Sequence, residues 1–230
     1  MLEITWLGHG SFQWKLETGE VIVLDPWLNG PTYPKDHQFD RIDAILVTHG
    51  HPDHLPDAAP LAKRFSPVVV SNYEISLWLA AKGVGNTVGM NKGGTTQAGP
   101  VRVTMTHAIH SSGIIEGEQI IYGGEATGFV VELPDKRKIY FAGDTDVFGE
   151  MALIGEMHAP ELSFLPIGDL YTMSPREASV AGRMLKSKKV VPMHYGTFPP
   201  LTGTPEELAA LLAGTGIDVM TLEIGKPVNW

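Results

Sequence analysis

Three histidines fall within six residues directly after a strongly apolar segment, and this juxtaposition constrains the chain more than any other feature of its sequence. Residues 42–47 form an almost continuous apolar run, as expected of a strand in a sheet that is covered on both faces. The run ends at Thr48 and leads straight into His49-Gly50-His51-Pro52-Asp53-His54. A surface loop that happens to be rich in histidine is the alternative, but the H-x-H-x-D-H spacing at the end of such a strand is highly specific.

The spacing within this loop suits two metal ions. His49 and His51 are two residues apart just beyond a strand, so their side chains can point to the same side. Asp53 and His54 are adjacent where the backbone turns towards a helix, so they need not face the same point. A di-metal centre requires several nitrogen and oxygen ligands from different strands, with positions left for water. The loop is therefore predicted to serve two neighbouring ions, with Pro52 stiffening it.

The rest of the chain shows a strand meander and then strands mixed with helices, in both halves. Residues 4–24 predict an antiparallel meander with a turn at 17–19, and residues 113–124 predict a loop or mobile hairpin. Helices are expected over 57–65, 72–82, from Ser174 towards Lys186 and from Thr204 to near Gly214, the last two with capping signatures. Further strands are expected at 68–70, 101–105, 129–133, 138–142, 162–166, 190–191 and 219–224. With no linker and no low-complexity segment, residues 1–230 are predicted to form one α/β (α+β) domain with helices outside two sheets.

Composition narrows the classes of function. With 17 basic and 26 acidic residues the net charge is −9, and without a basic tract nucleic acid is an unfavoured partner. The absence of cysteine excludes disulfides, thiolate metal sites and a cysteine nucleophile. No secretory signal and no run of about 20 apolar residues is present, so no membrane insertion is expected and a cytoplasmic protein is the default interpretation.

The run from Thr48 to His54 resembles the signature of the metallo-β-lactamase superfamily, and further matches follow in the order of that family. Ala108-Ile109-His110 resembles the third motif, Phe141-Ala142-Gly143-Asp144-Thr145 the fourth and Pro192-Met193-His194-Tyr195-Gly196 the last. The resemblance implies a four-layer αβ/βα sandwich with the metals between the edges of its two sheets. It also implies that one metal is bound by His49, His51 and His110, that the other is bound by Asp53, His54 and His194, and that Asp144 bridges the two.

Several of these assignments have a competing interpretation. Asp144 follows a glycine at a strand end, where an ordinary turn aspartate is common, and an isolated His194 is typical of a structural histidine. Their positions at strand ends, after so specific a first motif, favour ligation for both. His107 continues the strand alternation and is expected to serve packing or to support a ligand. His110 falls beyond the strand and is the favoured ligand of the two.

A narrower resemblance concerns Trp6-Leu7-Gly8-His9-Gly10-Ser11 and Leu24-Asp25-Pro26. These segments are similar to features of a branch that contains ascorbate-6-phosphate lactonase, N-acyl-phosphatidylethanolamine phospholipase D and many small uncharacterised hydrolases. The resemblance implies that His9 lies near the metals, in contact with substrate or with a ligand residue; a polar residue in a tight turn is the alternative. Asp25 is expected either to orient a ligand histidine or simply to end a strand before Pro26.

The function that these motifs imply is hydrolysis at a pair of divalent metal ions. Zinc suits nitrogen and carboxylate ligands best, and manganese, iron and nickel are chemically compatible. A hydroxide bridging the metals would attack an ester, lactone or phosphodiester bond of a small substrate, an anionic one included. Asp53, Asp144 and His9 are the predicted catalytic residues, with Asp53 able to accept the hydroxide's proton.

Two other functions stay open at this stage. One is a metal-dependent nuclease of the same superfamily, against which the acidic charge and the missing basic tract argue. The other is a binding protein that retains metal without turnover, against which the complete ligand set argues. An oxygen-handling di-iron protein is less consistent, because such relatives usually place glutamate where this chain has His51. A homo-oligomer is compatible with the sequence, but no feature demonstrates one.

Overall fold

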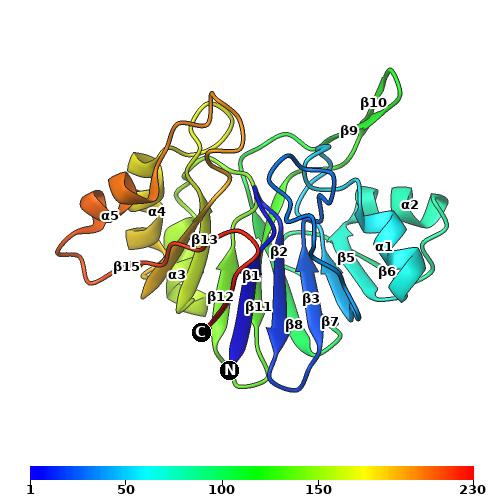
Figure 1. Ribbon diagram of the computed structural model, residues 1–230, viewed down its shortest axis with the longest axis horizontal. Helices are drawn as coiled ribbons and strands as arrows, with labels where there is room; N and C mark the ends of the chain where they lie inside the picture. Colours follow the sequence, from blue (N-terminus) through cyan, green and yellow to red (C-terminus); the bar gives the residue numbers. More distant parts are fainter.

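The computed structural model describes residues 1–230 as two seven-stranded sheets with helices on their outer faces (Figure 1). The first sheet has the order β16 (Pro227–Asn229), β1 (Leu2–Trp6), β2 (Phe12–Leu16), β3 (Val21–Leu24), β4 (Ala44–Leu46), β5 (Val68–Asn72) and β6 (Thr87–Met90). The second has the order β15 (Asp218–Val219), β14 (Lys189–Met193), β13 (Leu162–Pro166), β12 (Lys138–Phe141), β11 (Thr127–Glu132), β8 (Val101–His107) and β7 (Thr95–Ala98).

Five helices complete the layers. Helices α1 (Ala58–Phe65) and α2 (Tyr73–Ala81) lie beside the first sheet, and α3 (Met151–His158), α4 (Pro175–Met184) and α5 (Pro205–Leu212) lie beside the second (Figure 1). The predicted four-layer αβ/βα sandwich is confirmed. None of the helices is both long and apolar enough to cross a membrane.

Large aromatic side chains fill the space between the two sheets. Phe12 and Trp14 of β2 meet Phe164 of β13, with ring centroids 4.8 and 5.1 Å apart, and Phe12 also packs edge-on against Phe141 of β12. All four are completely buried. Burying such side chains is worth about 1.5–3 kcal/mol each, so this contact fixes how the sheets face one another. It thereby brings loops from both halves of the chain to one edge of the sandwich.

The local predictions for the N-terminal meander and for the helix starts are confirmed. Strands β1, β2 and β3 pair antiparallel in sequence order. Ser174 and Glu177 form a reciprocal capping box at the start of α4, and the Thr204 hydroxyl accepts a hydrogen bond from the Glu207 N–H at the start of α5. Residues 113–124 form a hairpin, β9 (Gly113–Glu116) with β10 (Gln119–Tyr122), that projects from the body (Figure 1).

The predicted final strand over 219–224 is wrong. Only Asp218 and Val219 pair with β14, after which the chain crosses to the first sheet. There Ile224 forms a single bridge to Trp6, and β16 pairs with β1. The apolar residues of this segment are spaced as in a strand because their side chains pack along the edge of the core. The backbone, however, passes from one sheet to the other.

Helix α3 was not predicted, and Gly155 in its middle explains why. Glycine weakens a helix by roughly 1 kcal/mol relative to alanine, so the sequence pattern argues against one. A Cβ atom at Gly155 would lie 2.4 Å from the Met184 carbonyl oxygen and 2.8 Å from that of Leu185. Glycine is therefore required here by the close approach of the end of α4.

Candidate metal centre

Every residue predicted to bind metal reaches one cluster at the edge of the sandwich. His49, His51 and His110 offer nitrogen atoms that lie within 4.8 Å of one another. Asp53, His54 and His194 form a second such group, to which His9 also belongs. The loops that carry these residues follow β1, β4, β8, β12 and β14. Residues as far apart in sequence as His9 and His194 thus meet at one place.

Asp144 lies between the two groups. Its Oδ2 atom is 3.8 Å from His49 Nε2 and 3.6 Å from His110 Nε2 on one side. On the other side it is 3.3 Å from His54 Nε2 and 3.0 Å from His194 Nε2. The side chain is only 2% exposed. This is the position that a bridging carboxylate requires, and an ordinary turn aspartate would be solvated.

Several buried atoms of the cluster have no hydrogen-bond partner. They are His49 Nε2, His54 Nε2, Asp144 Oδ1 and both ring nitrogens of His194. Buried polar atoms are nearly always paired, because leaving one unpaired costs about 1–3 kcal/mol. Imidazole nitrogen and carboxylate oxygen are also the donors that divalent transition metals prefer. The residues present therefore fit a metal centre.

Hydrogen bonds behind the cluster fix which ring nitrogen is free. The Thr48 hydroxyl donates to Asp25 Oδ2 at 2.6 Å, so it can only accept from His49 Nδ1, 2.9 Å away. His54 Nδ1 likewise donates to Asp25 Oδ2 at 2.9 Å. In the neutral form of each ring the Nε2 lone pair then faces the cluster, as metal ligands require. Asp25 therefore orients a histidine of the cluster, and its position before Pro26 is not its only role.

We expect Asp25→Asn to weaken divalent-metal binding about 10–100-fold, the usual effect of losing a residue that hydrogen-bonds a metal-binding histidine. Asparagine keeps the shape and tolerates the left-handed backbone of residue 25 (φ 43°), but it cannot accept from Thr48 N, Thr48 Oγ1 and His54 Nδ1 together. Metal titration by calorimetry measures the change. Asp57→Asn is the matched control, since Asp57 accepts a bond from Leu28 N outside the cluster. Equal affinity in the two variants would contradict the role of Asp25.

In the metal-free cluster, two imidazoles and the carboxylates beside them hold one another charged. Burial disfavours the charged form of His194, but Asp144 outweighs it and raises the pKa of His194 to about 9. Burial also disfavours the charged form of His54, but the pKa of His54 is raised well above its ordinary value by Asp144, Asp53 and Asp25. His194 and His54 in turn hold the pKa of Asp144 well below its usual range, although burial opposes this. A metal ion must therefore displace protons from these histidines when it binds.

His9 lies inside the cluster and is only 1% exposed. Its Nε2 atom is 2.9 Å from Asp53 Oδ2, its Nδ1 is 2.9 Å from Thr197 Oγ1, and its ring centroid is 3.7 Å from that of His194. Burial lowers its pKa to about 4, although the hydrogen bond with Asp53 opposes the shift. The structure thus places a neutral imidazole against a predicted metal ligand, and the alternative of a simple turn residue does not account for these contacts.

The two histidines at the end of β8 separate as predicted. His110 lies with the first group, with its Nε2 3.3 Å from His51 Nδ1. His107 points elsewhere: its Nδ1 is 2.8 Å from Lys92 Nζ, and its ring packs edge-on against Phe148. His107 is therefore a packing residue outside the cluster.

Two contributors to the site were not recognised in the sequence. A Cβ atom at Gly10 would lie 2.6 Å from His54 Cε1, so the ring of His54 depends on a glycine there. Gly10 directly follows His9 in the sequence, and this position indicates that Gly10 lies close to the site. Thr197, which contacts His9, lies 188 residues away in sequence, and no local pattern could have identified it.

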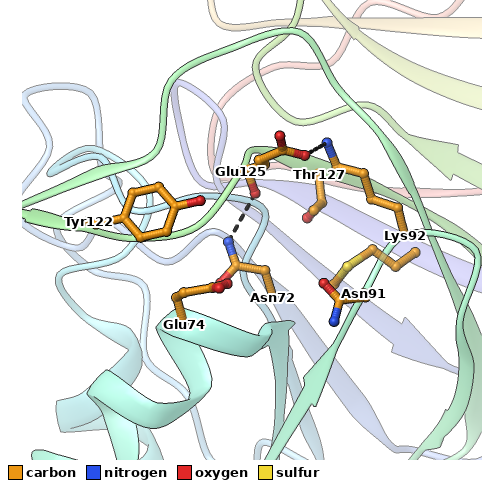
Figure 2. Close-up of a pocket in the computed structure, with 8 residues that line it drawn as sticks. Asn72, Glu74, Asn91, Lys92, Tyr122, Glu125 and Thr127 are labelled. Carbon is orange, nitrogen blue, oxygen red and sulfur yellow. Dashed lines mark hydrogen bonds and ion pairs between the residues drawn. The ribbon is translucent and has the colours of Figure 1, made fainter.

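A cavity of about 370 Å³ lies beside the hairpin, outside the histidine cluster. Figure 2 shows Tyr122 of β10 and Glu74 of α2 on one side of it and Lys92, paired with Glu125, on the other. Asn72 closes its floor by donating hydrogen bonds to Gly123 O and Glu125 O. None of the predicted metal ligands lines this cavity, so the cluster and the cavity are separate features.

The family model of the β-lactamase superfamily domain matches residues 20–195, which include every cluster residue except His9. This match defines the class of the protein and confirms the resemblance inferred from the motifs. A relative from Solibacter usitatus (strain Ellin6076), named UPF0173 metal-dependent hydrolase, is 59% identical over 230 residues and covers the whole of both chains. A relative of the same name from Methanopyrus kandleri is 41% identical over 98% of each chain. The chain belongs to the UPF0173 family of this superfamily.

A solved structure agrees over nearly the whole chain. It is that of Igni18, described as a novel metallo hydrolase from the hyperthermophilic archaeon Ignicoccus hospitalis KIN4/I. The TM-score is 0.87 and the identity 33%, with 99% of this chain and 97% of that chain covered. The two-sheet fold described above is therefore also that of a solved relative.

Proposed function

We propose that residues 1–230 act as one metal-dependent hydrolase domain with two divalent ions. The observation that carries the proposal is the convergence of buried, unpaired donor atoms on Asp144 from both sides. Under this proposal one ion is held by His49, His51 and His110, the other by Asp53, His54 and His194, and both by Asp144. The names of the relatives, metal-dependent hydrolase and metallo hydrolase, support the same conclusion.

Bound divalent ions would lower the pKa of water and polarise the bond to be cleaved. Residues of the chain hold the ligands in place and accept the proton. Asp144 holds the two halves of the site together. Thr48 and Asp25 accept the Nδ1 protons of His49 and His54, so that each ring presents its Nε2 atom to the ion. Asp53 faces the imidazoles through Oδ2 and is 24% exposed, which leaves Oδ1 to accept a proton from the attacking water. His9 lies directly beside Asp53, with its Nε2 atom 2.9 Å from Asp53 Oδ2.

The proposed substrate is a small molecule with an ester, lactone or phosphodiester bond, an anionic substrate included. A site rich in divalent charge inside a protein of net charge −9 attracts an anionic group locally, while the surface as a whole does not favour a nucleic-acid backbone. Zinc is the proposed metal, and manganese, iron and nickel suit the same nitrogen and oxygen donors.

The experiment compares metal-loaded protein on a lactone, a carboxyl ester, bis-p-nitrophenyl phosphate and single-stranded RNA. We expect turnover of one of the first three, with kcat reduced about 100-fold or more in Asp53→Ala, the usual cost of losing an acid–base group. Asp40→Ala removes an exposed aspartate outside the cluster and should leave turnover unchanged. Turnover that survives both chelation and Asp53→Ala would defeat the proposal, and preferred cleavage of RNA would favour a nuclease.

A further inference from the structure

We propose that His9 is a protein ligand of the second metal position, beside Asp53, His54 and His194. The inference rests on the proposed function, since it requires that the cluster bind metal. It adds a donor to the set implied by family resemblance, which takes no ligand from the loop after β1. It also gives the two metal positions different surroundings.

The first argument is the spacing of the donor atoms. Metal–donor bonds of about 2.1 Å place neighbouring donors of an octahedral ion roughly 3 Å apart and opposite donors roughly 4.2 Å apart. His9 Nε2 lies 2.9 Å from Asp53 Oδ2, while the Nε2 atoms of His54 and His194 lie 3.8 and 3.7 Å from it. The donor atoms of all four residues lie within 4.8 Å of one another. Small side-chain adjustments would therefore bring all four donors to one ion.

The second argument is the support behind the ring. His9 Nδ1 lies 2.9 Å from Thr197 Oγ1, just as His49 Nδ1 meets Thr48 Oγ1 and His54 Nδ1 meets Asp25. In each of the three, one nitrogen is held by an oxygen outside the cluster and the other faces into it. This is the arrangement by which proteins orient histidine ligands. His9 thus shares the construction of the predicted ligands.

The third argument is the cost of placing a histidine there. His9 has a left-handed backbone (φ 52°) between Gly8 and Gly10, a conformation that glycine or asparagine adopts more readily. The conformation is held because His9 O accepts hydrogen bonds from Trp6 Nε1 and from His194 N. His194 also has a left-handed backbone (φ 56°). Such strain at a built site indicates that the side chain has a function.

The consequence is an asymmetric centre. Counting Asp144 for both, the first position has four protein donors and the second has five. Five protein donors leave little room for substrate and suit an ion that accepts six ligands, such as Mn²⁺ or Fe²⁺, better than tetrahedral Zn²⁺. Substrate would then approach the first position, beside His51 and His110, which are the more exposed histidines of the cluster.

The test measures metal binding by His9→Asn, because asparagine tolerates the left-handed backbone and lacks the imidazole. Co²⁺ is titrated into metal-free protein by calorimetry and followed by visible absorption. Wild-type protein should bind two equivalents. The variant should bind the first with wild-type affinity and the second at least about 10-fold more weakly, with an altered spectrum for the second equivalent only. His158→Asn, a histidine at the end of α3, is the matched control.

Thr197→Val provides a second variant that leaves His9 in place. It should weaken the second equivalent by about 10-fold or more and leave the first unchanged. Thermal unfolding of the metal-free proteins checks that each variant is folded. Two equivalents bound by His9→Asn with wild-type affinity and spectrum would overturn the inference, even if turnover fell, because that outcome describes a residue that only positions Asp53. Failure of the wild-type protein to bind two equivalents would instead overturn the proposed function.

Discussion

Replacing Asp144 by alanine should remove both metals and abolish hydrolysis. The Asp144 carboxylate is the one group within 3.8 Å of four imidazole nitrogens, two from each half of the cluster. Loss of a supporting residue weakens metal binding about 10–100-fold, so loss of a shared ligand should exceed that range for both ions. We expect metal content after dialysis to fall from about two ions per chain to well below one, with turnover below detection.

Metal analysis and turnover of Asp144→Ala should be compared with those of Asp146→Ala. Asp146 lies two residues further along the same loop, and its exposed carboxylate accepts only the N–H of Val147. That control should keep its metals and its activity. The metal-free Asp144→Ala protein should also be less stable than metal-free wild type, because His54 and His194 lose the carboxylate that stabilises their charged forms. An Asp144→Ala protein that retains two ions would contradict the bridging position.

The sequence predicts the cluster well because each motif contains its own structural context. His49 follows an apolar strand, and Asp144 and His194 follow two others whose carboxyl ends reach the same edge of the sandwich. Given the fold, the ends of such strands must meet. Local signals of this kind also located the capping box of α4 and the N-terminal meander.

What the sequence could not supply depends on contacts between distant segments. The pairing of His9 with Asp53 and Thr197 joins three loops, and none of the three carries a pattern that names its partners. The glycine in α3 is explained only by the neighbouring end of α4. The crossing of the C-terminal segment to pair with β1 follows from the packing of two sheets, which no short window contains.

Removing the metals should lower the thermal stability as well as the activity of the protein. Each ion supplied at 100 times its Kd stabilises the folded chain by about 2.7 kcal/mol, so two ions contribute about 5 kcal/mol. For a chain of this size that corresponds to a rise in Tm of roughly 10–20 °C. Bound ions would also satisfy buried nitrogen and oxygen atoms that otherwise have no partner. Scanning calorimetry with and without a chelator measures the difference, and Mg²⁺, which binds imidazole poorly, is a control ion.

The same difference in Tm should grow as the pH rises from about 6.5 to about 9. In the metal-free protein burial lowers the pKa of His194, but Asp144 outweighs it and raises that pKa from 6.5 to about 9. Protonation of His194 therefore stabilises the folded state below pH 6.5. That stabilisation is lost as the pH rises through about 9. Over the same range the proton that competes with the metal is removed, and metal binding becomes tighter. Both effects reflect the same exchange of a proton for a metal ion, which widens the gap between the metal-bound and metal-free proteins. A gap that narrows over this range would show that His194 does not exchange its proton for a metal ion.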